Sequence, residues 1–194
     1  MNSYKSSCIM AGERGAFPIF DHKLEKDHEF IQRVVRADKD LLKLYKKNGR
    51  RNIANLTTAP TGTVSIMTQT TSGIEPAFLT SYTRRKKVNP NDKGARVDFV
   101  DHMGDQWQEF TVYHHNFKRW MEITGKTRVE NSPYWKATSN DVDWIKSVDI
   151  QAAAQKWVCH AISKTANIPN NTPVEVVKDM YMRAWEKGCK GFTV

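Results

Sequence analysis

The chain has 194 residues, of which 39% are hydrophobic and 26% charged, a composition typical of a folded soluble domain and not of a disordered segment. No stretch approaches the roughly 18 consecutive apolar residues of a membrane span, and the first residues lack the apolar run of a signal peptide, so we expect a cytoplasmic protein. The net charge of +9 favours an anionic partner such as a nucleotide, a nucleic acid or an acidic protein surface.

The first third of the chain is predicted to be helical. We expect a helix over residues 3–14 and a longer one over residues 24–47, whose apolar residues fall mostly on one stripe. The longer helix is expected to end at Gly49, where the backbone can adopt the left-handed conformation. A short strand is predicted over residues 53–58, and it leads directly into the motif described below.

The middle of the chain is predicted to alternate between strands and loops. We expect strands over residues 78–83 and 109–114, and a helix over residues 116–124. The segment 88–104 is rich in Asn, Asp and Gly and is predicted to be a surface excursion. The segment 125–140 shows no regular pattern.

The last third of the chain has the clearest periodicity. One amphipathic helix is predicted from apolar residues spaced by three and four positions, namely Ile150, Ala153, Ala154, Trp157, Val158 and Ala161. A second helix is predicted to begin at a capping box with proline in its first turn (Thr172-Pro173-Val174-Glu175) and to end at Gly188. Strands are expected over residues 162–168 and 191–194. Strands that alternate with helices at this spacing predict an α/β fold with crossover connections and a parallel sheet or barrel.

The segment that follows the predicted strand 53–58 is a candidate phosphate-binding loop. Gly62 allows a tight turn and the close approach of a ligand, and main-chain N–H groups from Thr61 to Ser65 can converge on an anion. Neither the P-loop pattern nor the Rossmann glycine pattern is present, and a Pro-Thr-Gly-Thr sequence also occurs in ordinary turns. The candidate site residues are Ala59, Pro60, Thr61, Gly62, Thr63, Val64 and Ser65.

Several segments of the chain together resemble the large chains of ribonucleotide reductases. The resemblance runs in one order through Arg14-Gly15-Ala16-Phe17-Pro18, the stretch 52–65, Thr71-Ser72-Gly73-Ile74-Glu75-Pro76, the stretch 151–169 and the closing stretch 184–194. The Ser-Gly-Ile-Glu-Pro form resembles the adenosylcobalamin-dependent class II more than the classes that use a separate radical subunit.

The resemblance implies a fold, a domain organisation and a role for the loop. The fold would be the C-terminal part of a ten-stranded α/β barrel, with residues 1–194 forming part of a single catalytic barrel domain that is incomplete at both ends. In the family, the loop that matches residues 59–65 binds the phosphates of the ribonucleotide substrate through main-chain amides.

The resemblance also implies the chemistry of the parent enzyme. That enzyme would reduce ribonucleoside di- or triphosphates to deoxyribonucleotides through a cysteine radical generated from adenosylcobalamin, with electrons from a thioredoxin- or glutaredoxin-like protein. The family's Asn-x-Cys-x-Glu motif is absent, so we assign no catalytic residue to this chain and expect it to be inactive without the rest of the reductase chain. The alternatives are the large subunit of a class I, radical-subunit-dependent reductase and a non-catalytic basic nucleotide-binding fragment.

The remaining candidates are interpreted as structural. Three widely separated cysteines (Cys8, Cys159 and Cys189) have no metal or disulfide spacing, and we expect reduced, partly buried thiols. No metal site is expected at His114-His115, and Glu75 is interpreted as fixing a turn. The run Arg84-Arg85-Lys86-Lys87 is typical of a solvated face, so no specific nucleic acid is expected as a partner. Asp141 and Asp143 are predicted to start a helix, and Trp157 and Trp185 to pack in the core.

Overall fold

The computed structural model describes residues 1–89 and 91–194, and it divides into two compact units. The first unit comprises Met1–Thr61 together with Asp143–Val194, and the second comprises Gly62–Val142. No helix in the described part is long and apolar enough to cross a membrane.

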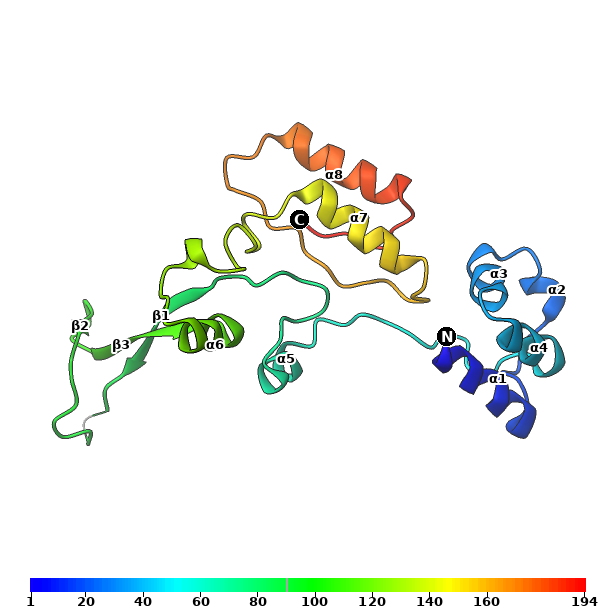
Figure 1. Cartoon of the computed structure of the whole chain (residues 1–194), viewed down its shortest axis with the longest axis horizontal. Helices are drawn as coiled ribbons and strands as arrows, with labels where there is room; N and C mark the ends of the chain where they lie inside the picture. Colours follow the sequence, from blue (N-terminus) through cyan, green and yellow to red (C-terminus); the bar gives the residue numbers. More distant parts are fainter. Residues whose placement is uncertain (90) are drawn as a thin grey trace. The chain divides into compact units, whose positions relative to one another are not determined.

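Helices dominate the first unit (Figure 1). Its elements are α1 (Asn2–Arg14), α2 (His22–Glu25), α3 (Glu29–Arg36), α4 (Lys39–Asn48), α7 (Trp144–Gln155) and α8 (Val174–Glu186). The predicted helix over residues 3–14 is confirmed as α1. It ends at Gly15, whose φ of 80° is a conformation that few other residues adopt.

The long helix predicted over residues 24–47 is wrong, because this stretch forms three short helices. Asp21 accepts a hydrogen bond from the Lys23 N–H at 2.7 Å and caps α2. Asp38 accepts hydrogen bonds from the N–H groups of Asp40 and Leu41 at 2.9 and 3.1 Å and caps α4. Each aspartate satisfies amide groups that a continuous helix would bond to its own carbonyls, so each starts a new helix. The predicted end at Gly49 is confirmed, with φ 70°.

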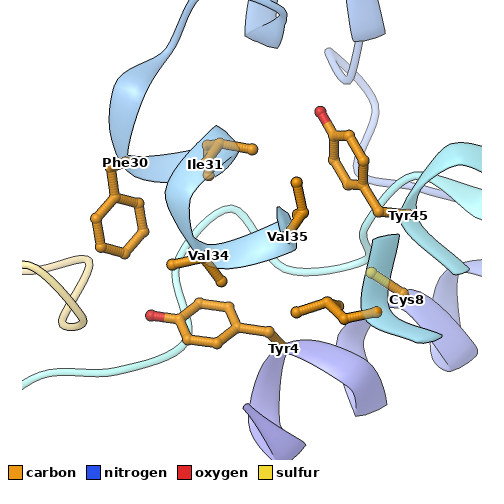
Figure 2. Packing of buried hydrophobic residues seen from close by; sticks show 8 residues of the cluster. Tyr4, Cys8, Phe30, Ile31, Val34, Val35 and Tyr45 are labelled. Atoms are coloured by element: carbon orange, nitrogen blue, oxygen red, sulfur yellow. The ribbon is translucent and has the colours of Figure 1, made fainter. Parts of the chain in front are cut away.

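The hydrophobic core of the first unit lies between these N-terminal helices. Figure 2 shows Tyr4 and Cys8 of α1 facing apolar side chains of α3, with Tyr45 of α4 nearby. The buried cluster consists of Tyr4, Cys8, Phe30, Ile31, Val34, Val35, Leu41 and Tyr45. Both α3 and α4 turn their apolar residues toward α1. The break between these two helices therefore changes the direction of the chain, but most of the apolar stripe predicted over residues 24–47 is still buried.

The face of α7 that packs inward is not the predicted one. Ile150, which belongs to the predicted apolar stripe, is 59% exposed, whereas Gln151 is completely buried. The helix also ends at Gln155, so Trp157 lies beyond it and is exposed. The predicted core position of Trp185 on α8 is wrong as well, since this side chain is 74% exposed. Hydrogen bonds from glutamines of α7, described below, decide which face is buried.

The predicted capping box of α8 does not form. The Thr172 hydroxyl donates to the Pro169 carbonyl at 2.7 Å instead of accepting from an amide of the first turn. Pro173 precedes the first helical residue, Val174, and its fixed φ already suits the helix entry. The predicted end at Gly188 is confirmed, with φ 78°.

Three segments of the first unit run parallel, but each pair is joined by a single bridge. Thr58 pairs with Ile162, and Thr165 pairs with Thr193. The strands predicted over residues 53–58, 162–168 and 191–194 are therefore wrong as regular strands, although the predicted parallel relation between them is present. Two bridges are too few for a strand ladder, because each strand segment touches its neighbour at one position only.

The second unit contains a small antiparallel sheet and two helices. Strand β3 (Gln106–Tyr113) lies between β1 (Ser81–Lys87) and β2 (Phe99–Val100). The predicted strand over residues 109–114 is confirmed with an earlier start, and the one over residues 78–83 begins three residues later than predicted. The register pairs Ser81 with Tyr113 and Lys87 with Trp107.

Loops and helices complete the second unit. The predicted excursion over residues 88–104 is irregular except for β2, and its residue 90 lies outside the described residues. The predicted helix over residues 116–124 is confirmed as α6 (His115–Thr124), closed by Gly125 in the left-handed conformation. The segment 125–140 is irregular apart from one 3-10 turn, Val129–Asn131. The remaining helix, α5 (Gly62–Thr68), starts inside the candidate loop.

Candidate functional site

The candidate loop begins where residues 56–58 are held beside residues 160–163. The His160 N–H donates to the Leu56 carbonyl at 3.1 Å, and the Ser163 N–H donates to the Thr58 carbonyl at 2.9 Å. These bonds align the two segments in parallel and place Ala59 directly after the paired region. Ligand sites of parallel α/β folds lie at the carboxyl ends of the strands, and the loop leaves the segment at that end.

The sulfur of Cys159 holds the start of this segment. The N–H groups of Asn55 and Leu56 both donate to Sγ at 3.0 Å, and the thiol donates to the Leu56 carbonyl at 3.1 Å. Burial raises the pKa of the Cys159 thiol, but the hydrogen bonds from Leu56, Asn55 and Tyr4 outweigh burial and leave the pKa below its usual value. The thiol therefore fixes the backbone that leads into the loop.

Two glutamines of α7 brace the same region. The Gln155 side-chain amide donates to the carbonyls of Val158 and His160 at 2.9 and 2.8 Å. The Gln151 amide donates to the Gly191 carbonyl at 2.7 Å. Both glutamine side chains are buried, so their amide groups find hydrogen-bond partners in these main-chain carbonyls instead of in water.

Within the loop, the unusual backbone conformation belongs to Thr61 and not to Gly62. Thr61 has a φ of 48°, whereas Gly62 lies outside the left-handed region and begins α5. A β-branched residue at positive φ is strained by about 1–3 kcal/mol, so the surrounding structure must hold it there. The expectation that Gly62 supplies the tight turn is therefore wrong.

The space above Gly62 is open. A Cβ atom built on this glycine would meet nothing within 4 Å. Gly62, Thr63 and Val64 are exposed, and their N–H groups belong to the first turn of α5, where an amide has no partner inside the helix. A ligand oxygen can approach these amides without displacing a side chain.

The Ser65 hydroxyl is occupied within the loop. Ser65 is buried, and its Oγ donates to the Gly62 carbonyl at 2.7 Å. In this conformation the hydroxyl is not free to donate to an anion, because its only hydrogen is already used. The hydroxyl of exposed Thr63 has no such internal role in the first turn and is accessible to a ligand.

The cysteines, His114 and the two aspartates that were interpreted as structural can be placed in the structure. The three cysteines are free thiols, and among the described residues no three His, Cys, Asp or Glu side chains form a group that could hold a metal ion. Burial and the neighbouring His115 lower the pKa of His114. Asp143 accepts from the Ile145 N–H at 2.8 Å and caps α7, whereas Asp141 accepts from Thr138 in a turn and starts no helix.

The run of basic residues lies on β1 and is exposed to solvent. Two of its four cations are paired across the sheet, since Arg85 bonds Glu109 at 2.7 Å and Lys87 bonds Asp105. Arg85 also lies 4.4 Å from the centroid of the Phe99 ring. This arrangement agrees with the predicted solvated face.

Comparison with known proteins identifies the family. The family model described as "Ribonucleotide reductase, barrel domain" matches residues 1–194. The chain belongs to the ribonucleotide reductase barrel-domain family. The candidate loop thus lies within the residues that this family model matches. The described residues contain both helices and a sheet, and all three regular strands lie in the second unit.

Similar proteins within the family are named as vitamin B12-dependent enzymes. The vitamin B12-dependent ribonucleoside-diphosphate reductase of Mycobacterium tuberculosis strain H37Rv is 30% identical over 205 residues, which cover 99% of this chain and 24% of that protein. The enzyme of the same name from Thermoplasma acidophilum is 28% identical over 204 aligned residues. These cover 99% of this chain and 23% of that protein. The vitamin B12-dependent ribonucleotide reductase of Streptomyces clavuligerus is 27% identical over 80% of this chain and 17% of its own length. The chain thus spans a quarter or less of the length of these relatives.

Sequence reasoning missed the residues that support the loop. Cys159 was expected to be a plain thiol, and Gln151 and Gln155 were assigned no individual role, yet all three bond main-chain atoms beside the paired segments. Lys164 is also buried, two residues beyond the pairing position Ile162. The available signal was the pair of glutamines four residues apart, which puts two amides on one face of α7.

Proposed function

We propose that this chain is part of the catalytic barrel of an adenosylcobalamin-dependent ribonucleotide reductase and that residues 59–65 bind the phosphates of the ribonucleotide substrate. The main support is the loop itself, which leaves a parallel pair at its carboxyl end and carries open space over Gly62. The family match over the whole chain and the names of the similar proteins support the class of enzyme. We place the loop in a ten-stranded α/β barrel of which residues 1–194 form part of one domain.

The loop binds phosphate through its main chain. The N–H groups of Gly62, Thr63 and Val64 point their positive ends out of the first turn of α5, and charge-assisted hydrogen bonds from amides to phosphate oxygens are stronger than those between neutral groups. Thr63 adds a hydroxyl donor. The hydrogen bond from the Ser65 hydroxyl to the Gly62 carbonyl helps to hold the turn in one conformation, so less entropy is lost when the substrate binds.

The parent enzyme reduces the 2′-hydroxyl of a ribonucleoside di- or triphosphate. Adenosylcobalamin, when bound, supplies the radical that forms on a cysteine of the parent enzyme. The role of this chain is to hold and orient the substrate.

The other partners of the chain follow from this assignment. The rest of the reductase chain supplies the radical cysteine and the cysteine pair that reduces the substrate, and a thioredoxin- or glutaredoxin-like protein restores that pair. The similar proteins are all named as vitamin B12-dependent, so a class I reductase is not favoured. Three free thiols are typical of a reducing compartment, and we propose a cytoplasmic location.

Two measurements test this function. Titration of the protein with a ribonucleoside diphosphate and with the matching nucleoside should show binding only of the phosphorylated form, because the loop recognises phosphate. Reduction of ribonucleotides by the complete reductase should require adenosylcobalamin and a dithiol reductant. Equal binding of nucleoside and nucleotide would remove the loop from the assignment, and activity that ignores cobalamin but needs a second subunit would replace it with class I.

A further inference from the structure

A second concave site lies among the short helices of the first unit, within residues 22–46. It has a volume of about 360 Å³, which falls in the range of about 300–1,000 Å³ that small-molecule pockets occupy. Residues of α2, α3 and α4 line it. The polar and aromatic residues among them are His22, Lys26, Gln32, Arg36, Tyr45 and Lys46.

The lining of this pocket is strongly basic. Lys26, Arg36 and Lys46 carry three positive charges, and no acidic residue of the described chain lines the pocket. Lys26 lies 3.8 Å from Asp27, but both side chains are largely exposed, and such a surface pair contributes little. Charges of one sign around a concavity repel one another and focus a positive potential into it.

The buried carboxylate nearest to the pocket is already neutralised. Glu25 accepts a hydrogen bond from the Tyr45 hydroxyl at 2.9 Å and bonds of 3.0 and 3.2 Å from Nε of Arg50. Arg50 does not line the pocket, so it compensates Glu25 without adding to the cluster of cations. The potential inside the pocket therefore remains positive.

The pocket has a fixed wall. The ring of His22 packs edge-on against Tyr45 at 5.0 Å and against Phe20 at 4.7 Å. The Gln32 side-chain amide donates to the Glu25 carbonyl at 3.1 Å, which ties α3 to the end of α2. These contacts hold the surface that the three cations surround, so little ordering is needed before a ligand binds.

We propose that this pocket binds a small phosphate-bearing anion about the size of pyrophosphate, independently of the loop at residues 59–65. Such an anion offers several negative oxygens to the three cations and removes their mutual repulsion. The guanidinium of Arg36 can bind two oxygens at once, and Lys26 and Lys46 act as point charges beside it. A ligand with a single negative charge leaves most of the repulsion in place and binds more weakly.

The test is a titration of the chain with sodium pyrophosphate at constant ionic strength, followed by calorimetry and by the NMR signal of the Gln32 side-chain amide. The double variant Arg36→Glu/Lys46→Glu reverses two lining charges. The matched control Lys43→Glu/Lys47→Glu makes the same change in net charge at two exposed positions of α4 outside the pocket. We expect the lining variant to raise Kd by about tenfold or more and the control by less than about twofold.

Three results would overturn the proposal. The first is that pyrophosphate shows no saturable binding to the unaltered chain, and the second is that the lining and control variants lose the same amount of affinity for it. The third is that the NMR signal of the Gln32 side-chain amide does not change when pyrophosphate binds. Thermal unfolding checks that each variant is folded, and Lys46→Gln replaces the double variant if that one is not. The Gly62→Val variant separates the two phosphate sites, because the response at Gln32 should persist when the loop is blocked.

Discussion

The substitution Gly62→Val separates the folding of the candidate loop from its function. Gly62 lies outside the left-handed region, and its missing side chain would meet nothing within 4 Å, so valine fits without a clash. An exposed substitution of this kind changes the free energy of unfolding by roughly 0.5 kcal/mol or less. We therefore expect a normally folded protein, measured by urea unfolding followed by circular dichroism.

The effect on nucleotide binding should be much larger. The two methyl groups of valine would occupy the open space through which a phosphate oxygen reaches the amides of Gly62 and Thr63. Each hydrogen bond to a charged group contributes about 1.5–3 kcal/mol, so the loss of two bonds costs about 3–6 kcal/mol, or at least about a hundredfold in Kd. Calorimetric titration with a ribonucleoside diphosphate measures this change, and Gly62→Ala should give a smaller loss.

A control variant tests whether a change in helix propensity, and not a blocked approach to the amides, explains weaker nucleotide binding by Gly62→Val. Met67→Val places the same side chain in α5 at a position that is 80% exposed, and we expect unchanged nucleotide binding. If folded Gly62→Val binds the nucleotide with an unchanged Kd, the loop does not contact the phosphates and the assignment of residues 59–65 fails.

Three further predictions concern the first unit. Arg50→Met should reduce the free energy of unfolding by about 3–5 kcal/mol in urea titrations, because it leaves the buried carboxylate of Glu25 unpaired; adding Glu25→Gln should restore part of the loss. Gln151→Met should destabilise the protein by about 0.5–1.5 kcal/mol, since the Gly191 carbonyl loses its donor, and a stability equal to the original would contradict this role. The pKa of Cys159 is lowered and that of Cys189 is raised, so at pH 7–8 a larger fraction of Cys159 is thiolate. Iodoacetamide should therefore modify Cys159 before Cys189, as followed by peptide mass spectrometry. The reverse order would show that hydrogen bonds do not lower the pKa of Cys159.

Local signals in the sequence predicted where four of the eight α-helices in the described residues end. Glycines at the ends of α1, α4, α6 and α8 stand at positive φ in the structure, as their position after an apolar stripe indicated. Such ends depend on the backbone of a few neighbouring residues and are therefore readable without the rest of the fold. The division of residues 24–47 was missed because the apolar stripe continues through the whole stretch, whereas the carboxylate of Asp38 caps a new helix within it.

The position of the candidate loop was predicted from its own sequence, but its internal geometry was not. The glycine drew attention as the turning residue, yet Thr61 takes the positive φ. No local rule favours a β-branched residue there, so the surroundings must impose it. The role of Cys159 was equally hidden, because its partners lie 103 and 104 residues earlier in the chain.

The burial of α7 shows why an apolar stripe can identify a helix and still mislead about its orientation. Hydropathy ranks Ile150 above Gln151, but it does not count the main-chain carbonyls that a neighbouring segment presents. The hydrogen bond from the Gln151 amide to the Gly191 carbonyl contributes about 0.5–1.5 kcal/mol, somewhat less than the gain from burying one large apolar side chain. Gln155 bonds two further carbonyls, so the glutamine face satisfies three main-chain acceptors together. The polar face therefore turns inward, and the segments beside the loop depend on α7 through hydrogen bonds more than through hydrophobic contact.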